Sequence, residues 1–560
     1  MKKKKKYFDQ PVREKTDVKK FFKTNEPLLL SLFLTAAAIL YFSHLNDFFS
    51  LDGDNVVYSL LAKALLKGKG FVDIRTPFTP AFASYWPGFP FLLIPSTLLL
   101  PDNIIALKIV PVLFTLLSLF YLYQYFKMKF DILWAFLALF FIMINPVIFH
   151  FAHTVLSQAP FLASVIMAAY YLEKYIRENK STFGKEFIIF TIATVAAKYI
   201  REEGTFLFLI MLFYILIHKK FKAAGVFAGF FIITNVAWML YMKKAMAATA
   251  PHIKKYFFGM RSSRYINLLA ADQFDPDKGF VTLPVLFNRI YQNFLLYFNI
   301  IIPRITLGFN VGNSLLVALI TAFFVFYGFF ISLPVKKIKP FITFVKENAT
   351  PAVLYFFFGL GLVHLSISRS EKYLYPIIPF MLFFIIYGLY QLVRRMTKNY
   401  TRIVFGILVF ILVYFSFSRT SELMSIERNF QYDPVFTHYL ELAKWFRVNT
   451  PEDTKVLSRK GEYFYWYSQR QSATHQVTTN TFAILEFIKD MDFDYVLLTQ
   501  TGFDYVSRPS LDRVIQSYPR FFINPKGGYV PNTGNQRQFF ILQVNKPLLR
   551  QFIKERRKSD

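Results

Sequence analysis

Long apolar blocks, separated by short polar and basic segments, fill the first three quarters of the chain. The blocks run for about 15–23 residues, and one helical crossing of a bilayer core needs about 20 apolar residues. The segments that we predict to span a membrane are 27–45, 104–126, 132–149, 155–173, 187–200, 204–217, 223–242, 311–333, 351–367, 374–392 and 403–418. The pattern therefore predicts an all-α polytopic membrane bundle of about eleven spans.

Lys and Arg accumulate in every second connection between these blocks. The basic connections are Lys127/Lys129, Lys174–Lys185, His218–Lys222, Lys336–Lys339 and Arg394–Arg402. Cytoplasmic loops of membrane proteins carry an excess of Lys and Arg. The alternation therefore places these connections and the basic N-terminus, residues 1–26, in the cytoplasm, and an odd number of crossings leaves the C-terminus outside.

Two further apolar stretches fit the interface of a membrane better than its core. Residues 87–101 contain four prolines and are too short to cross, so we expect an interfacial or re-entrant segment. Residues 284–303 carry Arg289 and Asn293 and are expected to lie along the interface. The membrane domain, residues 27–418, then has two long external loops at 46–103 and 243–283.

Beyond residue 418 the apolar content falls and charges of both signs appear. Asp433-Pro434 predicts a helix that begins there and continues to about Val448, because Asp caps helices and Pro suits their first position. Extended runs at 455–458, 495–499 and 539–544 alternate with a helical stretch near 482–490. Residues 419–560 are therefore predicted to form a small extracytoplasmic α/β domain.

The composition agrees with a membrane protein. Of the 560 residues, 54% are hydrophobic, and the formal net charge is +30. Because the Lys and Arg lie largely in loops where they orient helices, we predict membrane lipids and no nucleic acid as partners. The chain has no Cys, and His150 with His153 is too small a set for zinc. We therefore expect no metal cofactor.

The first external loop carries the most specific candidate chemistry. Asp52 and Asp54 lie just beyond the first predicted span, before an amphipathic stretch at 60–66. A carboxylate near an apolar interface is partly desolvated, which suits it to removing a proton from a hydroxyl. The alternative is that one of these side chains only caps the following helix, which is common for Asp.

Four motifs occur in a fixed order on the predicted external side. They are GDNVVYSLLAKALLKGKGFVD with YWPGFPFLL (residues 53–73 and 85–93), HTVLSQAPF (153–161), KYIREEG (198–204) and EKYLYPIIP (371–379). Together they resemble the signature of polyprenyl-phosphate-dependent glycosyltransferases of the C-type membrane fold. The resemblance is closest to protein O-mannosyltransferases and lipid A aminoarabinose transferases. Three positions depart from the family pattern: Trp86 replaces Pro, Gln158 replaces Glu and Lys372 replaces Arg.

This resemblance implies that a sugar is transferred from a polyprenyl phosphate to a hydroxyl of a lipid, glycan or protein acceptor outside the cytoplasmic membrane. The lipid-linked sugar is a substrate, and the resemblance implies no cofactor. The residues that it assigns are Asp54 and Asp52 for catalysis, Arg201, Lys372 and Arg369 for the phosphate, and Tyr58, Tyr85 and Gln158 for substrate binding. Arg201 has alternative roles, either in an ion pair with Glu202, Glu203 or another acid inside the bundle or in snorkelling to the interface. Lys372 has an alternative role beside Glu371.

Two other classes of protein stay open at this point. A secondary transporter usually shows repeated halves and broken helices, which are not evident in this sequence. A membrane-anchored binding or assembly protein would use residues 419–560 as its working part. The chain lacks the large inserted domain of eukaryotic mannosyltransferases, so we expect a multi-pass protein of a bacterial inner membrane.

Overall fold

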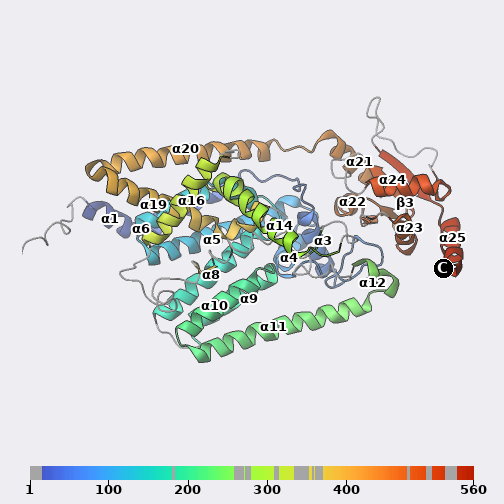
Figure 1. Cartoon of the computed structure of the whole chain (residues 1–560), viewed down its shortest axis with the longest axis horizontal. Helices are drawn as coiled ribbons and strands as arrows, with labels where there is room; N and C mark the ends of the chain where they lie inside the picture. The colour runs from blue at the N-terminus through green and yellow to red at the C-terminus, as the bar shows by residue number, and fades with distance from the viewer. Residues whose placement is uncertain are drawn as a thin grey trace, which may run out of the picture.

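The computed structural model describes residues 15–178, 183–257, 270–271, 279–307, 314–332, 352, 354–355, 359, 370–475, 478, 480–499, 508–523 and 539–559. The molecule is elongated, with helix α1 near one end and α25 at the other (Figure 1). Helices dominate, as the sequence predicts, and a single small sheet in the described residues lies near the C-terminal end.

The N-terminal part contains the following helices. They are α1 (Lys15–Thr24), α2 (Glu26–Phe42), α3 (Asp54–Leu66), α4 (Gly88–Leu99), α5 (Ile104–Lys129), α6 (Ile132–Met143), α7 (Pro146–Ala152), α8 (Gln158–Arg177), α9 (Lys185–Ile200), α10 (Gly204–Ile217), α11 (Phe221–Ala248), α12 (Pro251–Phe257), α14 (Leu283–Leu296), the π-turn η3 (Tyr297–Ile301), α15 (Ile302–Leu307), α16 (Leu315–Ser332), the short turns η4 (Glu371–Tyr373), η5 (Tyr375–Ile377) and η6 (Lys398–Tyr400), α19 (Ile378–Thr397) and α20 (Thr401–Arg428). Most of their buried apolar side chains form one large core.

Four helical segments of the described residues are long and apolar enough to cross a membrane. They are α5, α11, α16 and the segment Tyr375–Arg428, which contains both α19 and α20. Counting the bent pair α6 and α7 as one span gives five. The predicted eleven spans are therefore not confirmed, because α2, α4 and α10 are shorter apolar helices. Most of the predicted span 351–367 lies outside the described residues.

The predicted span 132–149 is bent in its middle. Helices α6 and α7 meet at 65°, since Asn145 begins a new helix whose first residue is Pro146. The Asn145 side chain accepts hydrogen bonds from the backbone N–H groups of Val147 and Ile148, and Pro cannot continue the preceding helix.

The proline-rich segment 87–101 forms the short helix α4, which packs on α3, α5 and α9. A Cβ atom on Gly88 would lie 2.6 Å from the carbonyl carbon of Tyr199, so only glycine permits this approach. The contact brings the start of α4 against the end of α9.

The C-terminal part is an α/β unit. Its elements are α21 (Pro434–Asn449), β1 (Lys455–Leu457), α22 (Gly461–Ser468), β2 (Gln471–Ala473), α23 (Thr481–Asp490), β3 (Tyr495–Thr499), α24 (Arg508–Ser517), η7 (Pro519–Phe521), β4 (Phe522–Ile523), β5 (Phe539–Val544) and α25 (Lys546–Ser559). The strand order is β2-β1-β3-β5-β4, parallel between β2, β1 and β3 and antiparallel elsewhere. Asp433 caps α21 through a 2.9 Å hydrogen bond from Phe436 N. The predicted helix at this position and the three predicted strands are confirmed.

Candidate active site

Asp54 is the first residue of α3, at the turn that follows α2. Gly53 makes this turn with φ = +80°, a conformation that favours glycine, and a Cβ atom there would lie 2.6 Å from Glu462 Oε1. The carboxylate of Asp54 does not cap α3, since Gly53 occupies the capping position without a side-chain bond. Instead Asp54 Oδ1 accepts a hydrogen bond from the Tyr85 hydroxyl, and Oδ2 lies 3.8 Å from Lys372 Nζ. The capping alternative is therefore wrong for Asp54.

The two predicted tyrosines lie against each other beside Asp54. The rings of Tyr85 and Tyr58 stack with their centroids 4.7 Å apart. Tyr58 is buried, and its hydroxyl lies 3.4 Å from Ser157 Oγ. Through Tyr85 and Tyr58, Asp54 is therefore connected to Ser157, which lies at the start of α8.

Arg201 ends α9 and is buried. Its Nη1 donates to Ser157 Oγ at 3.1 Å, and its Nη2 lies 2.6 Å from Glu203 Oε1. The alternative role of Arg201 in an ion pair with Glu203 is thus confirmed. The same guanidinium also completes a continuous chain of contacts: Asp54, Tyr85, Tyr58, Ser157, Arg201 and Glu203. We call these six residues the contact chain.

Lys372 reaches Asp54 from a segment far along the sequence. It lies in the short turn η4, where Ser370 Oγ accepts a 3.3 Å hydrogen bond from the Lys372 backbone N–H. The neighbouring Glu371 pairs with Arg304 at 2.9 Å. The structure therefore pairs Lys372 with Asp54, and Glu371 with another cation. Arg369 lies outside the described residues.

Asp52 and Gln158 lie beside the contact chain without joining it. Asp52 is exposed in the turn before α3. Gln158 is the first residue of α8 and is buried, and its Oε1 has no hydrogen-bond partner among the described residues. Neither position contradicts a role in substrate binding, and both assignments stay predictions.

The two histidines considered for metal are separated by their environments. His153 is buried, with Nδ1 2.7 Å from Phe149 O and Nε2 2.8 Å from Tyr41 O. His150 is half-buried. Within the described ranges no three His, Asp or Glu side chains come together as a ligand set.

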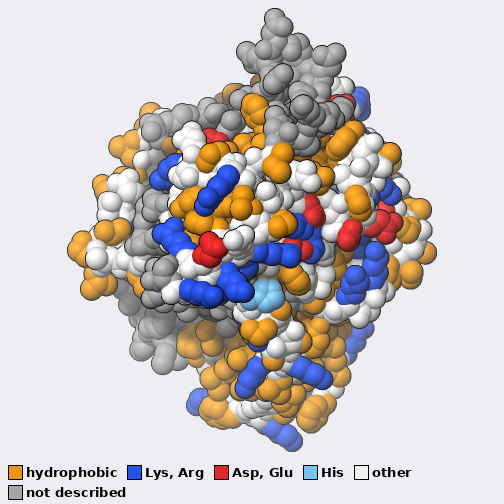
Figure 2. All heavy atoms as spheres, turned by 90° about the vertical axis from the view of Figure 1, so that its right-hand side faces the viewer, with side chains coloured by type: hydrophobic (Ala, Val, Ile, Leu, Met, Phe, Trp, Pro, Cys, Tyr) orange, Lys and Arg blue, Asp and Glu red, His pale blue; other side chains and the backbone are white. Residues whose placement is uncertain are grey.

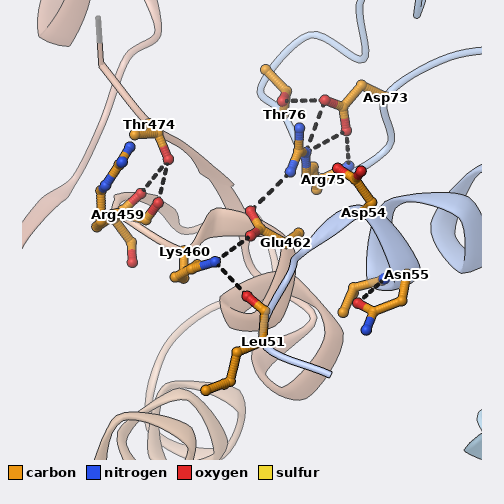
Figure 3. Close-up of polar contacts among 12 residues, drawn as sticks. Leu51, Asp54, Asn55, Asp73, Arg75, Thr76, Arg459, Lys460, Glu462 and Thr474 are labelled. Carbon is orange, nitrogen blue, oxygen red and sulfur yellow. Dashed lines mark hydrogen bonds and ion pairs between the residues drawn. The ribbon is translucent and has the colours of Figure 1, made fainter. Parts of the chain in front are cut away.

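The C-terminal part holds the turn that precedes Asp54 (Figure 3). Lys460 Nζ donates to the carbonyl oxygen of Leu51 at 2.9 Å, and the Tyr463 hydroxyl donates to the carbonyl oxygen of Ser50. Burial lowers the pKa of Lys460, an effect that Glu462 opposes. Sequence reasoning missed Lys460 because it follows Asp54 by some four hundred residues and carries no motif.

Comparisons with known proteins found one family match and several similar solved structures. Residues 83–241 match the model of the dolichyl-phosphate-mannose-protein mannosyltransferase family. No curated protein matches the chain. The Archaeoglobus fulgidus oligosaccharyltransferase, tethered with an acceptor peptide, is similar over 86% of this chain and 70% of its own, with 10% identity and a TM-score of 0.56. ArnT from Cupriavidus metallidurans, in the apo state, is similar over 93% of this chain and 99% of its own, with 10% identity and a TM-score of 0.53.

The two solved structures show the fold, and the family match over residues 83–241 supports the class of enzyme. The fold is that of the C-type membrane glycosyltransferases, and the protein is a glycosyltransferase. The resemblance predicted from the four motifs is confirmed, and the transporter alternative is not supported. The matched segment contains Tyr85, Ser157, Arg201 and Glu203 of the contact chain.

Proposed function

We propose that this protein transfers a sugar from a polyprenyl-phosphate donor to an acceptor hydroxyl on the extracytoplasmic face of a bacterial inner membrane. The observation that carries the proposal is the placement of Asp54. One of its carboxylate oxygens meets the hydroxyl of Tyr85, and the other faces the ammonium group of Lys372. The matched family supports the donor class, because its name specifies a sugar carried on a polyprenyl phosphate.

Asp54 acts as the general base. It takes the proton of the acceptor hydroxyl while that oxygen forms a bond to the anomeric carbon of the sugar. The carboxylate is about one-third exposed, so an acceptor can reach it. The Tyr85 hydroxyl orients the carboxylate through one oxygen. The second oxygen lies 3.8 Å from Lys372 Nζ, beyond hydrogen-bond distance, and takes the proton.

The bond from the anomeric carbon to the carrier breaks in the same step, and the polyprenyl phosphate leaves as an anion. Lys372 and Arg201 stabilise this developing charge. The guanidinium of Arg201 is held by Ser157 and Glu203, and its planar fork suits phosphate oxygens. The acceptor, which can be a lipid, a glycan or a protein, keeps the sugar.

The decisive experiment is the substitution Asp54→Asn in the purified protein, reconstituted with a panel of labelled polyprenyl-phosphate sugars. The variant should be folded and inserted but inactive with the donor that the wild type uses. Asp453→Asn is the matched control, because Asp453 is exposed on the C-terminal part and should leave transfer unchanged. Transfer by the Asp54→Asn protein at the wild-type rate would refute the base assignment. A wild type that uses none of the donors would refute the donor class.

The face of the membrane can be tested separately. The chain has no Cys, so a single Asp453→Cys substitution provides a unique label site. A membrane-impermeant maleimide should label this variant in intact spheroplasts. Labelling that requires permeabilised membranes would place the C-terminal part in the cytoplasm and refute the proposed orientation.

A further inference from the structure

A cavity of about 240 Å³ lies between the first external loop and the C-terminal part. Arg75 and Thr76 line it from the loop, and residues 459–462 and 472–474 line it from the C-terminal part (Figure 3). Hydrogen bonds fix the two walls to each other: Ser472 N donates to the Arg75 carbonyl oxygen at 2.6 Å, and Gln471 Nε2 donates to that of Thr76 at 3.3 Å. The cavity is therefore a built feature of this junction.

The charge lining the cavity is positive. Arg75, Arg459 and Lys460 contribute three cations, and Glu462 contributes the only carboxylate among the lining residues. Glu462 pairs with Arg75, whose Nη1 lies 3.1 Å from its Oε2, and its Oε1 lies 3.9 Å from Lys460 Nζ. Behind the lining, Asp73 also pairs with Arg75, at 2.9 Å from its Nε. Burial lowers the pKa of Lys460, Glu462 opposes this, and the nearby charge of Arg459 lowers the pKa further. An anion in the cavity would relieve this repulsion between cations.

Two uncharged donors also meet at the cavity. The hydroxyl of Ser472 is fully buried and has no hydrogen-bond partner among the residues that the structure describes, which is costly for a buried polar group unless a ligand satisfies it. Helix α22 begins at Gly461 without a side-chain cap, and the N–H groups at a helix start favour anions. A Cβ atom on Gly461 would lie 3.2 Å from Ser472 Oγ, so glycine keeps this corner of the cavity open.

We propose that this cavity binds the phosphate group of a small polar molecule or of a lipid headgroup. The planar fork of Arg459 matches the oxygens of phosphate, and the Ser472 hydroxyl with the start of α22 supplies further donors. The cavity has room beyond the phosphate for an attached glycerol- or sugar-sized unit. The cavity shares no residue with the contact chain, although Lys460 and Glu462 also contact the turn before Asp54.

The test is calorimetric titration of the full-length protein in detergent. The two probes are sn-glycerol 3-phosphate, which is a free phosphate, and phosphatidic acid in mixed micelles, which is a lipid phosphate. Glycerol and diacylglycerol are the uncharged controls. Binding of either phosphate probe supports the site, and the probe that binds more tightly identifies the source of the phosphate.

Substitutions locate the binding. Ser472→Ala should fold like the wild type, because its hydroxyl has no partner to lose, yet it should weaken binding roughly tenfold, as expected for one hydrogen bond to a charged group. Arg459→Gln should weaken binding at least as much, whereas Arg513→Gln on the exposed side of α24 should leave it unchanged. The inference is overturned if neither probe binds, or if both cavity variants bind like the wild type. It is also overturned if Lys372→Gln alone abolishes binding, since the phosphate then occupies the proposed donor site.

Discussion

Removing one hydroxyl next to Asp54 tests the proposed reaction without disturbing the fold. In Tyr85→Phe the ring that stacks on Tyr58 at 4.7 Å is kept, and only the hydrogen bond to the Asp54 carboxylate is lost. A hydrogen bond to a charged group contributes about 1.5–3 kcal/mol. Since each 1.36 kcal/mol changes a rate tenfold, kcat should fall about 10- to 100-fold if this bond orients the base in the transition state.

The assay is steady-state transfer of a labelled sugar from the polyprenyl-phosphate donor, with kcat and KM measured separately. A loss in kcat at constant donor KM is expected, because Tyr85 contacts the base and is not proposed to contact the phosphate. Tyr58→Phe is a matched comparison, because its hydroxyl contacts Ser157 and not Asp54. Wild-type kcat in Tyr85→Phe, or a loss confined to KM, would refute the orienting role of Tyr85.

Two further predictions concern stability in detergent. Gly88→Ala should destabilise the protein by about 1–3 kcal/mol, since its Cβ would lie 2.6 Å from the Tyr199 carbonyl carbon. The midpoint of thermal unfolding should fall in this variant. Gly225→Ala is the control and should keep the wild-type midpoint, because nothing lies near its Cβ position. Burial alone would raise the pKa of Asp492, but three basic neighbours hold it below the ordinary 3.8. Its stabilisation is therefore present above pH 3.8 and lost as the pH falls through the lowered value. Denaturant titrations should show Asp492→Asn as less stable at neutral pH and equal to the wild type in strong acid; a pH-independent difference would contradict this.

The local elements of the fold were largely predictable because their signals are local. Asp433-Pro434 correctly predicted the start of α21, where Asp caps the helix and Pro takes its first position. Asn145-Pro146 is the same signal, yet the continuous apolar block around it led us to predict one span over 132–149. The structure shows a 65° bend there. A capping residue followed by Pro therefore outweighs hydrophobic continuity, even within an apolar block.

The candidate site was predictable only in part. Its motifs pointed to Asp54, Tyr85, Arg201 and Lys372. The structure joins Asp54 to Tyr85 and Lys372 directly and links Arg201 to them through Ser157 and Tyr58. The sequence assigned no role to Ser157, which connects these residues, or to Lys460, which holds the turn before Asp54. The importance of both depends on tertiary contacts. Ser157 lies within a quoted motif but gains its role only by touching both Tyr58 and Arg201. A single sequence contains no signal for such a junction.

The surface at the C-terminal end of the molecule shows clusters of Lys and Arg with fewer acidic side chains (Figure 2), which by itself suggests an independent binding module. The contacts at the turn before Asp54 argue otherwise. Lys460 and Tyr463 bind the backbone of Leu51 and Ser50, and Glu462 fills the space beside Gly53. A catalytic base must be held within roughly 0.5 Å of its productive position. Three of the four positions before Asp54 thus contact α22 and its N-cap, so the C-terminal part is a component of the proposed active site and not an appendage to it.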